Sequence, residues 1–140
     1  MRPLWCLQFS ALVIAMAGGA LTACRGGGSA GPSSGEPVVT NSPDDFHLVW
    51  SDLSTFTGSR NYTWVNNGTR ATVTQSSSGL TSADSVKLII RNPSGAEVYR
   101  GDLRVLGGFQ STTTNAGNYT IRIEIRGATG TIDFRVQRSG

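Results

Sequence analysis

GNYTIRIEIRGATGTIDFRV, the stretch from residue 117 to residue 136, decides the fold class of this 140-residue chain. Apolar side chains recur there at every second position, first in one run and then in another after a break. The positions are Ile121, Ile123, Ile125, Ile132, Phe134 and Val136. Because successive side chains of a β-strand point to opposite faces, this period of two predicts strands with one apolar face each.

The same alternation extends over the rest of the chain from Phe46 onward. Phe46, Leu48 and Trp50 form one such run, and Val86, Leu88 and Ile90 form another. Helix-period runs are absent, and turn-forming residues recur roughly every 8 to 12 residues. Residues 46–140 are therefore predicted to form a small all-β domain, a jelly-roll-like antiparallel β-sandwich of about seven or eight strands.

Three turns give specific expectations about pairing. Asn67-Gly68 favours a tight type I′ hairpin, which would set Trp64 opposite Ala71 and Tyr62 opposite Val73. Asn92-Pro93-Ser94-Gly95 suits a type I turn between two strands.

The third turn, Thr129-Gly130, is predicted to close a hairpin with Arg126 opposite Asp133 and Glu124 opposite Arg135. A longer loop over residues 127–130 would instead place Glu124 against Asp133. We favour the shorter loop because it sets opposite charges against each other.

The N-terminal residues have the anatomy of a secretory signal. A basic residue, Arg2, precedes an apolar stretch from Leu4 to Ala20, and small residues follow. The four residues Leu21-Thr22-Ala23-Cys24 then resemble the lipobox of bacterial lipoproteins. That resemblance implies cleavage before Cys24, with Leu21, Thr22 and Ala23 recognised by the peptidase, and lipidation of the Cys24 thiol. The alternative is an uncleaved transmembrane helix, for which the apolar stretch is long enough.

These features divide the chain into three parts. Residues 1–23 are predicted to be a lipoprotein signal peptide. Residues 24–45, rich in Gly, Ser and Pro, are predicted to be the lipidated cysteine and a flexible tether with a reach of roughly 25 Å. Residues 46–140 would be the sandwich. Arg25, following the cysteine, implies sorting to the outer membrane if the sorting habit of enteric bacteria applies.

Composition excludes several classes of function. The 12 Lys and Arg residues against 9 Asp and Glu give a net charge of +3, too small and too dispersed to indicate nucleic-acid binding. Cys6 lies in the leader and Cys24 at its end, so no disulfide is expected in the domain. His47 is the one histidine and has no Cys neighbours, so neither a zinc site nor any cofactor is expected, and the chain is not predicted to be an enzyme.

Few residues remain as candidates for binding. Trp50, Trp64 and Tyr62 could stack on sugar rings, but each falls on the apolar face of its strand, which favours packing in the core. Tyr119 is expected in the core as well, with its hydroxyl tying down a corner. His47 alternates with apolar neighbours and is expected to face solvent. Arg100-Gly101-Asp102 spells an integrin-type tripeptide, which we expect in a turn and interpret as a chance match.

Residues 84–137 also resemble the prepeptidase C-terminal family of bacterial secreted proteins. The resemblance rests on the motifs Val86-Lys87-Leu88-Ile89-Ile90, Asn92-Pro93-Ser94-Gly95, Ala116-Gly117-Asn118-Tyr119-Thr120-Ile121-Arg122-Ile123 and the closing strand Thr131 to Val136. It implies a jelly-roll-like accessory module. Members often carry acidic residues after the position of Asp84 that bind calcium, whereas Ser85 and Lys87 stand there in this chain, so no metal is predicted.

Anchor, tether and sandwich together predict a function class. We expect a membrane-anchored bacterial envelope lipoprotein, facing the periplasm or the cell surface, whose domain is a non-catalytic binding or assembly module for another envelope protein. The alternative is a carbohydrate-binding module for peptidoglycan or surface polysaccharide, which needs Trp50 or Trp64 at the surface. A hydrolytic enzyme is a third hypothesis and would need an acidic or His-containing cleft.

Overall fold

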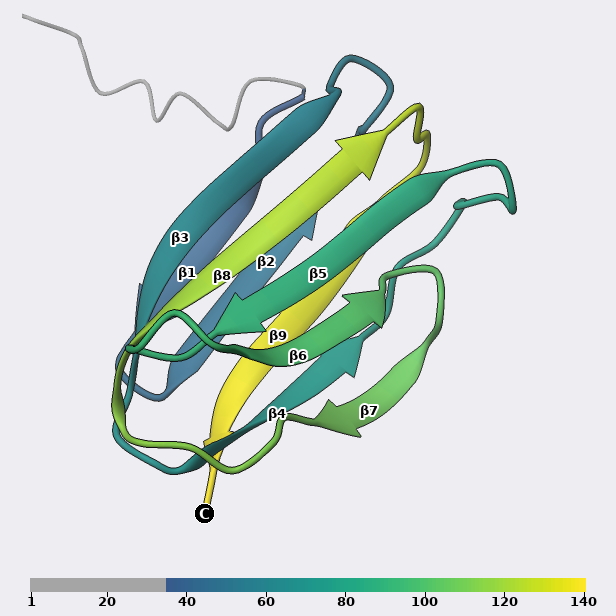
Figure 1. Ribbon diagram of the computed structural model, residues 1–140. Helices are drawn as coiled ribbons and strands as arrows, with labels where there is room; N and C mark the ends of the chain where they lie inside the picture. The colour runs from purple at the N-terminus through teal and green to yellow at the C-terminus, as the bar shows by residue number, and fades with distance from the viewer. Residues whose placement is uncertain (1–34) are drawn as a thin grey trace, which may run out of the picture.

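The computed structural model describes residues 35–140, and within them nine β-strands form two antiparallel sheets (Figure 1). The strands are β1 (Val38–Ser42), β2 (Asp45–Trp50), β3 (Gly58–Asn66), β4 (Arg70–Gln75), β5 (Ser85–Arg91), β6 (Glu97–Asp102), β7 (Gly107–Gln110), β8 (Gly117–Arg126) and β9 (Ile132–Ser139). The lipobox residues Leu21, Thr22, Ala23 and Cys24 lie outside the described residues.

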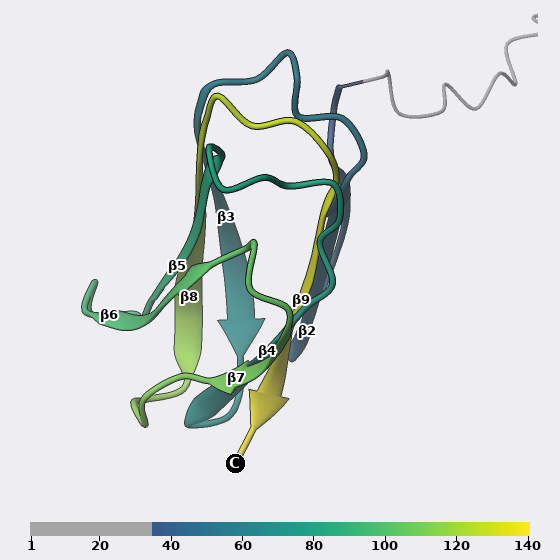
Figure 2. The ribbon, with the colours of Figure 1, turned by 90° about the vertical axis from the view of Figure 1, so that its right-hand side faces the viewer.

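The two sheets face each other as the layers of a sandwich, which Figure 2 shows edge-on. One sheet has the order β1-β2-β9-β4-β7 and the other has the order β3-β8-β5-β6. Without β1, this is the four-on-four arrangement of a jelly roll, in which consecutive strands alternate between the sheets except for β5 and β6, which pair in one sheet. The prediction of an all-β, jelly-roll-like sandwich is confirmed.

The sandwich begins earlier than expected. β1 and the start of β2 fall inside residues 24–45, which were predicted to be tether, so the boundary at residue 46 is wrong. β1 pairs along its whole length with β2, from Val38 opposite Val49 to Ser42 opposite Asp45. The β-branched run Val38-Val39-Thr40 explains the strand. With β1 included, the structure has nine strands among the described residues, one more than the upper number predicted.

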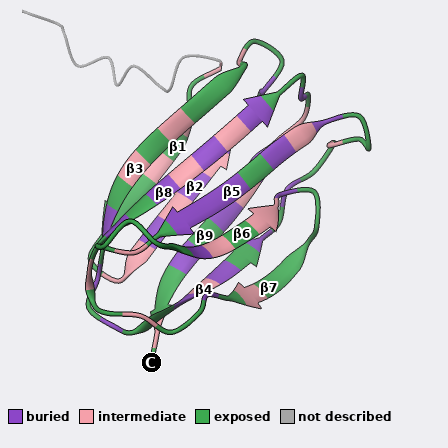
Figure 3. Cartoon of the chain, in the orientation of Figure 1, coloured by how far each residue is buried: buried purple, intermediate pink, exposed green. Residues whose placement is uncertain are grey.

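The core lies between the sheets and is built from the alternating apolar positions. Figure 3 shows the resulting bands of buried and exposed residues along the strands. Fully buried side chains with no exposed surface include Phe46, Leu48, Trp50, Trp64, Val86, Leu88, Ile90, Tyr119, Ile121, Ile123, Ile125, Ile132, Phe134 and Val136. The inward and outward faces were therefore predicted correctly for these strands.

The predicted Asn67-Gly68 hairpin is wrong. β3 and β4 belong to different sheets, so Trp64 lies opposite Tyr119 of β8, and Val73 lies between Val136 and Phe109. Neither Asn67 nor Gly68 has the positive φ that a type I′ turn needs. The buried side chain of Asn66 instead stabilises the loop that connects the two sheets. Its Nδ2 donates to Arg70 O at 3.2 Å, and its Oδ1 accepts from Gly68 N at 2.9 Å.

The pairing predicted around Thr129-Gly130 is wrong for the same reason. β8 and β9 lie in opposite sheets, and the loop between them crosses the end of the sandwich with Ala128 buried beneath it. Arg126 lies opposite Ser85, not Asp133. The charges find other partners: Asp133 contacts His47, and Arg135 donates to both carboxylate oxygens of Asp45.

The turn at residues 92–95 is confirmed. Gly95 N donates to Asn92 O at 2.9 Å, and the flanking strands β5 and β6 pair antiparallel. The side chain of Asn92 reinforces the turn, since its Oδ1 accepts from the backbone amides of Ser94 and Ala96. An Asx side chain that accepts from amides further along the chain is a common way to stabilise such a turn.

Candidate functional site

The first described residues are held to one end of the sandwich by a group that we call the N-terminal clamp: Gly35, Glu36, Trp50, Phe56 and Arg60. The indole Nε1 of Trp50 donates to Gly35 O at 2.9 Å. Arg60 donates to both carboxylate oxygens of Glu36, at 2.9 and 3.0 Å. Its guanidinium also lies over the rings of Trp50 and Phe56, at 5.5 and 5.2 Å from their centres. One hydrogen bond thus holds Gly35, a two-fold hydrogen-bonded ion pair holds Glu36, and cation–π contacts fix Arg60 on the domain side.

The clamp sets the direction from which the chain enters the domain. Trp50 lies opposite Ile132, and Gly58 opposite Ile125, so the loops at residues 51–57 and 127–131 are at this end, with residues 76–84 beside them. We call it the proximal end. The C-terminus lies at the other, distal end (Figure 1). Sequence reasoning missed the clamp because residues 35 and 36 stand in the Gly-, Ser- and Pro-rich segment.

The aromatic residues considered for sugar stacking do not form a platform. Trp50 and Trp64 have no exposed surface. Tyr62 is half-buried and packs on Phe46, with ring centres 5.4 Å apart. Desolvation by burial raises the pKa of the Tyr62 hydroxyl. The two tryptophan rings therefore offer no face to a glycan, which removes the condition on which the carbohydrate-binding alternative depended.

Tyr119 is buried and ties a corner, as its position predicted. Its ring packs edge-on against Trp64 with centres 5.7 Å apart, and its hydroxyl donates to Asn115 O at 2.9 Å. The bond joins β8 to the loop before it, as in the tyrosine corners of β-sandwiches. His47 lies on the outer face of β2, about half exposed, with Nε2 at 2.9 Å from Asp133 Oδ1.

The integrin-type tripeptide lies in β6 rather than in a turn, so that expectation was wrong. The side chain of Arg100 is engaged by Glu97, and that of Asp102 by Arg104. Gly101 faces inward under the ring of Tyr99, whose hydroxyl would lie 2.2 Å from a Cβ at that position. A side chain at position 101 would therefore displace the ring of Tyr99.

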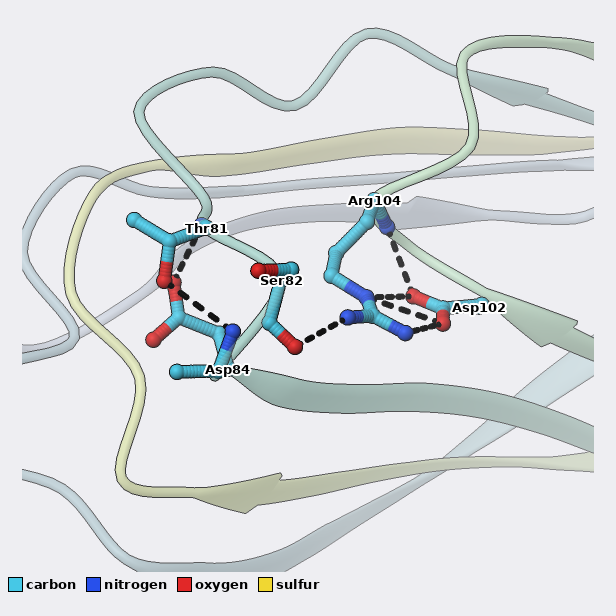
Figure 4. A network of polar contacts seen from close by, with 6 residues as sticks. Thr81, Ser82, Asp84, Asp102 and Arg104 are labelled. Atoms are coloured by element: carbon cyan, nitrogen blue, oxygen red, sulfur yellow. Dashed lines mark hydrogen bonds and ion pairs between the residues drawn. The ribbon is translucent and has the colours of Figure 1, made fainter.

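A polar network joins two loops at the proximal end (Figure 4). Arg104 Nε donates to Asp102 at 2.9 Å, and Arg104 Nη1 donates to Ser82 O at 2.9 Å. The carboxylate of Asp84 accepts from Thr81 N at 2.6 Å and stabilises the turn before β5. The network fixes the loop of residues 76–84 against the turn that leads into β7.

A second polar residue, Gln75 at the end of β4, is buried between the two sheets next to Tyr99 of β6. With its amide oxygen accepting from the Tyr99 hydroxyl at 2.8 Å, its amide nitrogen donates to Val105 O at 2.6 Å and to Asp102 O at 3.1 Å. A buried amide that satisfies three groups fixes their relative positions. Gln75 thus holds the backbone next to two exposed apolar residues, Val105 and Leu106, which are 53% and 61% exposed.

An open hollow of about 340 Å³ lies at the proximal end of the β3-β8 pair. Its lining residues are Thr57, Gly58, Ser59, Arg122, Glu124 and Arg126. Arg122 Nε donates to Glu124 at 2.9 Å, which neutralises one of the two arginines. Among these lining residues, none forms a pair of a nucleophile and a base.

Two properties bear on metals and membranes. Across residues 35–140 no group of three or more His, Cys, Asp and Glu side chains is arranged to hold a metal ion. In the same part of the chain, no helix of the length and apolar character needed to cross a bilayer is present.

We expect acid to destabilise the sandwich. Hydrogen bonds from Asn67 lower the pKa of Asp44, and hydrogen bonds from Arg135 and Arg104 lower those of Asp45 and Asp102. A pKa lowered in the folded state gives stability that is present above the ordinary value of 3.8 and is lost as the pH falls through the folded value. The urea midpoint should fall between about pH 5 and pH 3.

Asp44→Asn provides the matched variant for this measurement, because asparagine keeps an oxygen that can accept from Asn67 N. Its midpoint should depend less on pH than that of the unaltered protein. A midpoint that stays constant over the same range in the unaltered protein would contradict the role given to these carboxylates.

No protein-family model matches the chain, and no curated protein matches it. The resemblance to the prepeptidase C-terminal family therefore stays a prediction, and the functional conclusion depends on the sequence and geometry of this chain alone.

Proposed function

We propose that the protein is a bacterial envelope lipoprotein, anchored through acyl chains on Cys24, whose jelly roll is a non-catalytic binding module for another envelope protein. The observation that carries the proposal is the N-terminal clamp, which fixes Gly35 and Glu36 to the proximal end. Only ten residues separate Gly35 from the lipobox cysteine, Cys24. A lipid anchor before the clamp would orient the whole domain.

The short connection limits how far the domain can stand from a bilayer. Residues 25–34 separate Cys24 from Gly35. At about 3.5 Å per residue, ten residues span at most about 35 Å when fully extended. The proximal end would then face the membrane, which we propose is the outer membrane where the host has one. The distal end would face the periplasm or the cell surface, where a partner could reach it.

The distal loops, residues 67–69, 92–96 and 112–116, are suited to binding a protein. They are polar and uncharged, and they hold one another in place. Asn92 Nδ2 donates to Thr114 Oγ1 at 2.7 Å, and Thr114 N donates to Thr69 O at 2.8 Å. Loops held rigidly by a scaffold can bind without a large ordering cost, which supports recognition through this end.

The anchor is tested with Cys24→Ala in cells fed a labelled palmitate. The unaltered chain should incorporate label and sediment with membranes, whereas Cys24→Ala should incorporate none and be released, since the anchor is lost with the acceptor thiol. Equal labelling of the two chains would contradict the lipidation. Membrane retention of an unlabelled Cys24→Ala chain would favour the uncleaved transmembrane helix.

The binding role is tested by crosslinking the tagged full chain in its native cells and identifying what is captured. Ala116 in the distal loops and Ala83 in the proximal loop are both exposed, so Ala116→Arg and Ala83→Arg form a matched pair. A specific protein that is captured by the unaltered chain and by Ala83→Arg, but lost with Ala116→Arg, supports the proposal. Capture of polysaccharide alone, or loss with Ala83→Arg only, counts against it.

A further inference from the structure

A two-sheet sandwich has four edge strands, and three of them are protected in this domain. Exposed edges present unpaired backbone groups that invite pairing with another chain, so proteins usually cover or disrupt them. β1 and β3 cover each other: Asn41 Nδ2 donates to Thr63 O at 2.8 Å, and Asp44 N donates to Val65 O at 2.8 Å. The edges β1 and β3 therefore lie side by side, one in each sheet, and hydrogen bonds join them.

The third edge, β6, is disrupted rather than covered. A β-bulge shifts the register between Ile90 and Arg91 where β6 pairs with β5. Charged side chains stand at Glu97, Arg100 and Asp102 along the strand. One of its backbone acceptors is already used, because Thr112 N donates to Val98 O at 3.0 Å. Bulges and charges are common ways of preventing edge pairing.

β7, the fourth edge, has none of these protections. Its sequence, Gly107-Gly108-Phe109-Gln110, contains no charge and no proline, and its register with β4 is regular. Ser111 N, directly after the strand, donates to Ala71 O at 2.9 Å. Because hydrogen-bonding residues alternate along an antiparallel ladder, the N–H and C=O groups of Gly108 and Gln110 point away from β4. Figure 1 shows β7 at the margin of its sheet.

Apolar side chains flank this open edge. Val105 and Leu106, just before β7, are the two most exposed of the large hydrophobic residues described. Phe109 is only half-buried and packs against Tyr99 with ring centres 6.3 Å apart. Exposed apolar groups beside unpaired backbone donors and acceptors are the combination that strand addition uses.

The charge pattern indicates what the edge can pair with. From Val105 to Gly117 the chain has no charged residue, and the neighbouring β4 and its following loop have none from Ala71 to Ala83. A second copy of the same edge can therefore approach without like-charge repulsion. Pairing about a two-fold axis also requires a self-complementary strand, since the same residues meet on both sides.

We propose that β7 pairs antiparallel with β7 of a second copy, about a two-fold axis at Phe109, and so joins the two five-stranded sheets. In this register Gly108 of each copy lies opposite Gln110 of the other, and the outward N–H and C=O groups form four hydrogen bonds. The two Phe109 rings meet as the close, non-hydrogen-bonded pair of the ladder, where aromatic side chains stabilise pairing. The proposal goes beyond the partner binding proposed above and uses a different surface.

The test uses the full chain in the membranes of cells that express it with two different tags. A photoreactive phenylalanine analogue replaces Gln110, which is exposed on β7, or replaces Asn61, which is exposed on β3 in the other sheet. Irradiation should give an adduct that carries both tags from position 110 and none from position 61. An adduct of position 110 with another protein, or no adduct there, overturns the self-pairing and leaves the binding test at Ala116 unaffected.

Gly108 supplies the matched variants. A Cβ at Gly108 meets nothing within 4 Å, so Gly108→Ala adds a side chain in open space and keeps the N–H, whereas Gly108→Pro removes the N–H from both copies. Gly108→Pro should lower the yield of the two-tag adduct roughly tenfold or more relative to Gly108→Ala. Equal yields from two folded variants overturn the proposal.

A charge exchange covers the case in which Gly108→Pro does not fold. Gly108→Lys and Gly108→Asp would each place like charges near one another across the two-fold axis, so each alone should give little two-tag adduct. A mixture of the two should restore it. Failure of the mixture to exceed the separate variants overturns the pairing.

Discussion

Gly130→Ala is expected to lower the free energy of unfolding by about 3 kcal/mol or more. Gly130 has a φ of +100°, which side chains disfavour. A Cβ there would lie 2.7 Å from the carbonyl carbon and oxygen of Gly79 and from Ser78 O. These are backbone atoms, and they cannot move aside easily, because Ser78 and Thr131 exchange two backbone hydrogen bonds of 2.9 and 2.8 Å. The substitution should therefore disrupt the contact between the β4–β5 and β8–β9 loops.

Gly127→Ala in the same loop is the matched control. Gly127 has a φ of +58°, and a Cβ there meets nothing within 4 Å. Alanine adopts this left-handed region at a cost of about 1 to 2 kcal/mol. Urea unfolding of both variants gives the comparison. If Gly127→Ala were as destabilising as Gly130→Ala, the positive φ alone would explain the loss of stability, and the clash with Gly79 would contribute nothing to it.

The alternation of apolar residues predicted which face of each strand lies in the core, and it did so for a physical reason. Side-chain direction in a strand depends only on the parity of the position, which is a local property. Ile121, Ile123 and Ile125 are all fully buried, while Arg122 and Glu124 between them remain partly exposed. Trp50 and Trp64 were likewise placed in the core from parity.

Strand pairing was not predictable in the same way. Asn67-Gly68 and Thr129-Gly130 are short loops rich in turn-forming residues, and such loops suit a hairpin within one sheet or a crossing between two sheets. The choice depends on non-local packing. The charge argument for Arg126 and Asp133 also failed, because Asp133 has a partner 86 residues away in His47. A charged side chain on a sheet face has several neighbours of opposite charge with which it could pair, and the sequence alone does not say which one lies next to it.

The clamp lay beyond sequence reasoning for a different reason. Its members come from three separated places in the chain: residues 35 and 36, Trp50, and the pair Phe56 and Arg60. Composition made residues 24–45 look like a uniform tether. The signal that could have shortened it was Val38-Val39-Thr40, a β-branched run followed by Pro43, which often begins a turn.

Trp50→Ala is expected to lower the free energy of unfolding by about 3 to 5 kcal/mol, the usual loss when a large aromatic side chain is removed from a core. Trp50 has no exposed surface, and Phe56 packs on its ring with centres 4.7 Å apart. The variant also removes the donor to Gly35 O and the ring under Arg60. Urea unfolding should show the loss, and amide hydrogen exchange should be faster in β1 than in β8.

Trp50→Phe and Trp64→Phe separate the clamp from the core, since each replaces one fully buried indole with a smaller ring. Trp50 Nε1 donates to Gly35 O, whereas Trp64 Nε1 has no hydrogen-bond partner among residues 35–140. Losing a satisfied donor costs about 1 kcal/mol, so Trp50→Phe should be the more destabilising of the two by about that amount. Exchange in residues 38–42 should accelerate for Trp50→Phe alone. Equal exchange in the two variants would mean that the indole bond does not hold the entering chain, and the orientation proposed for the anchored domain would then depend on Arg60 and Glu36.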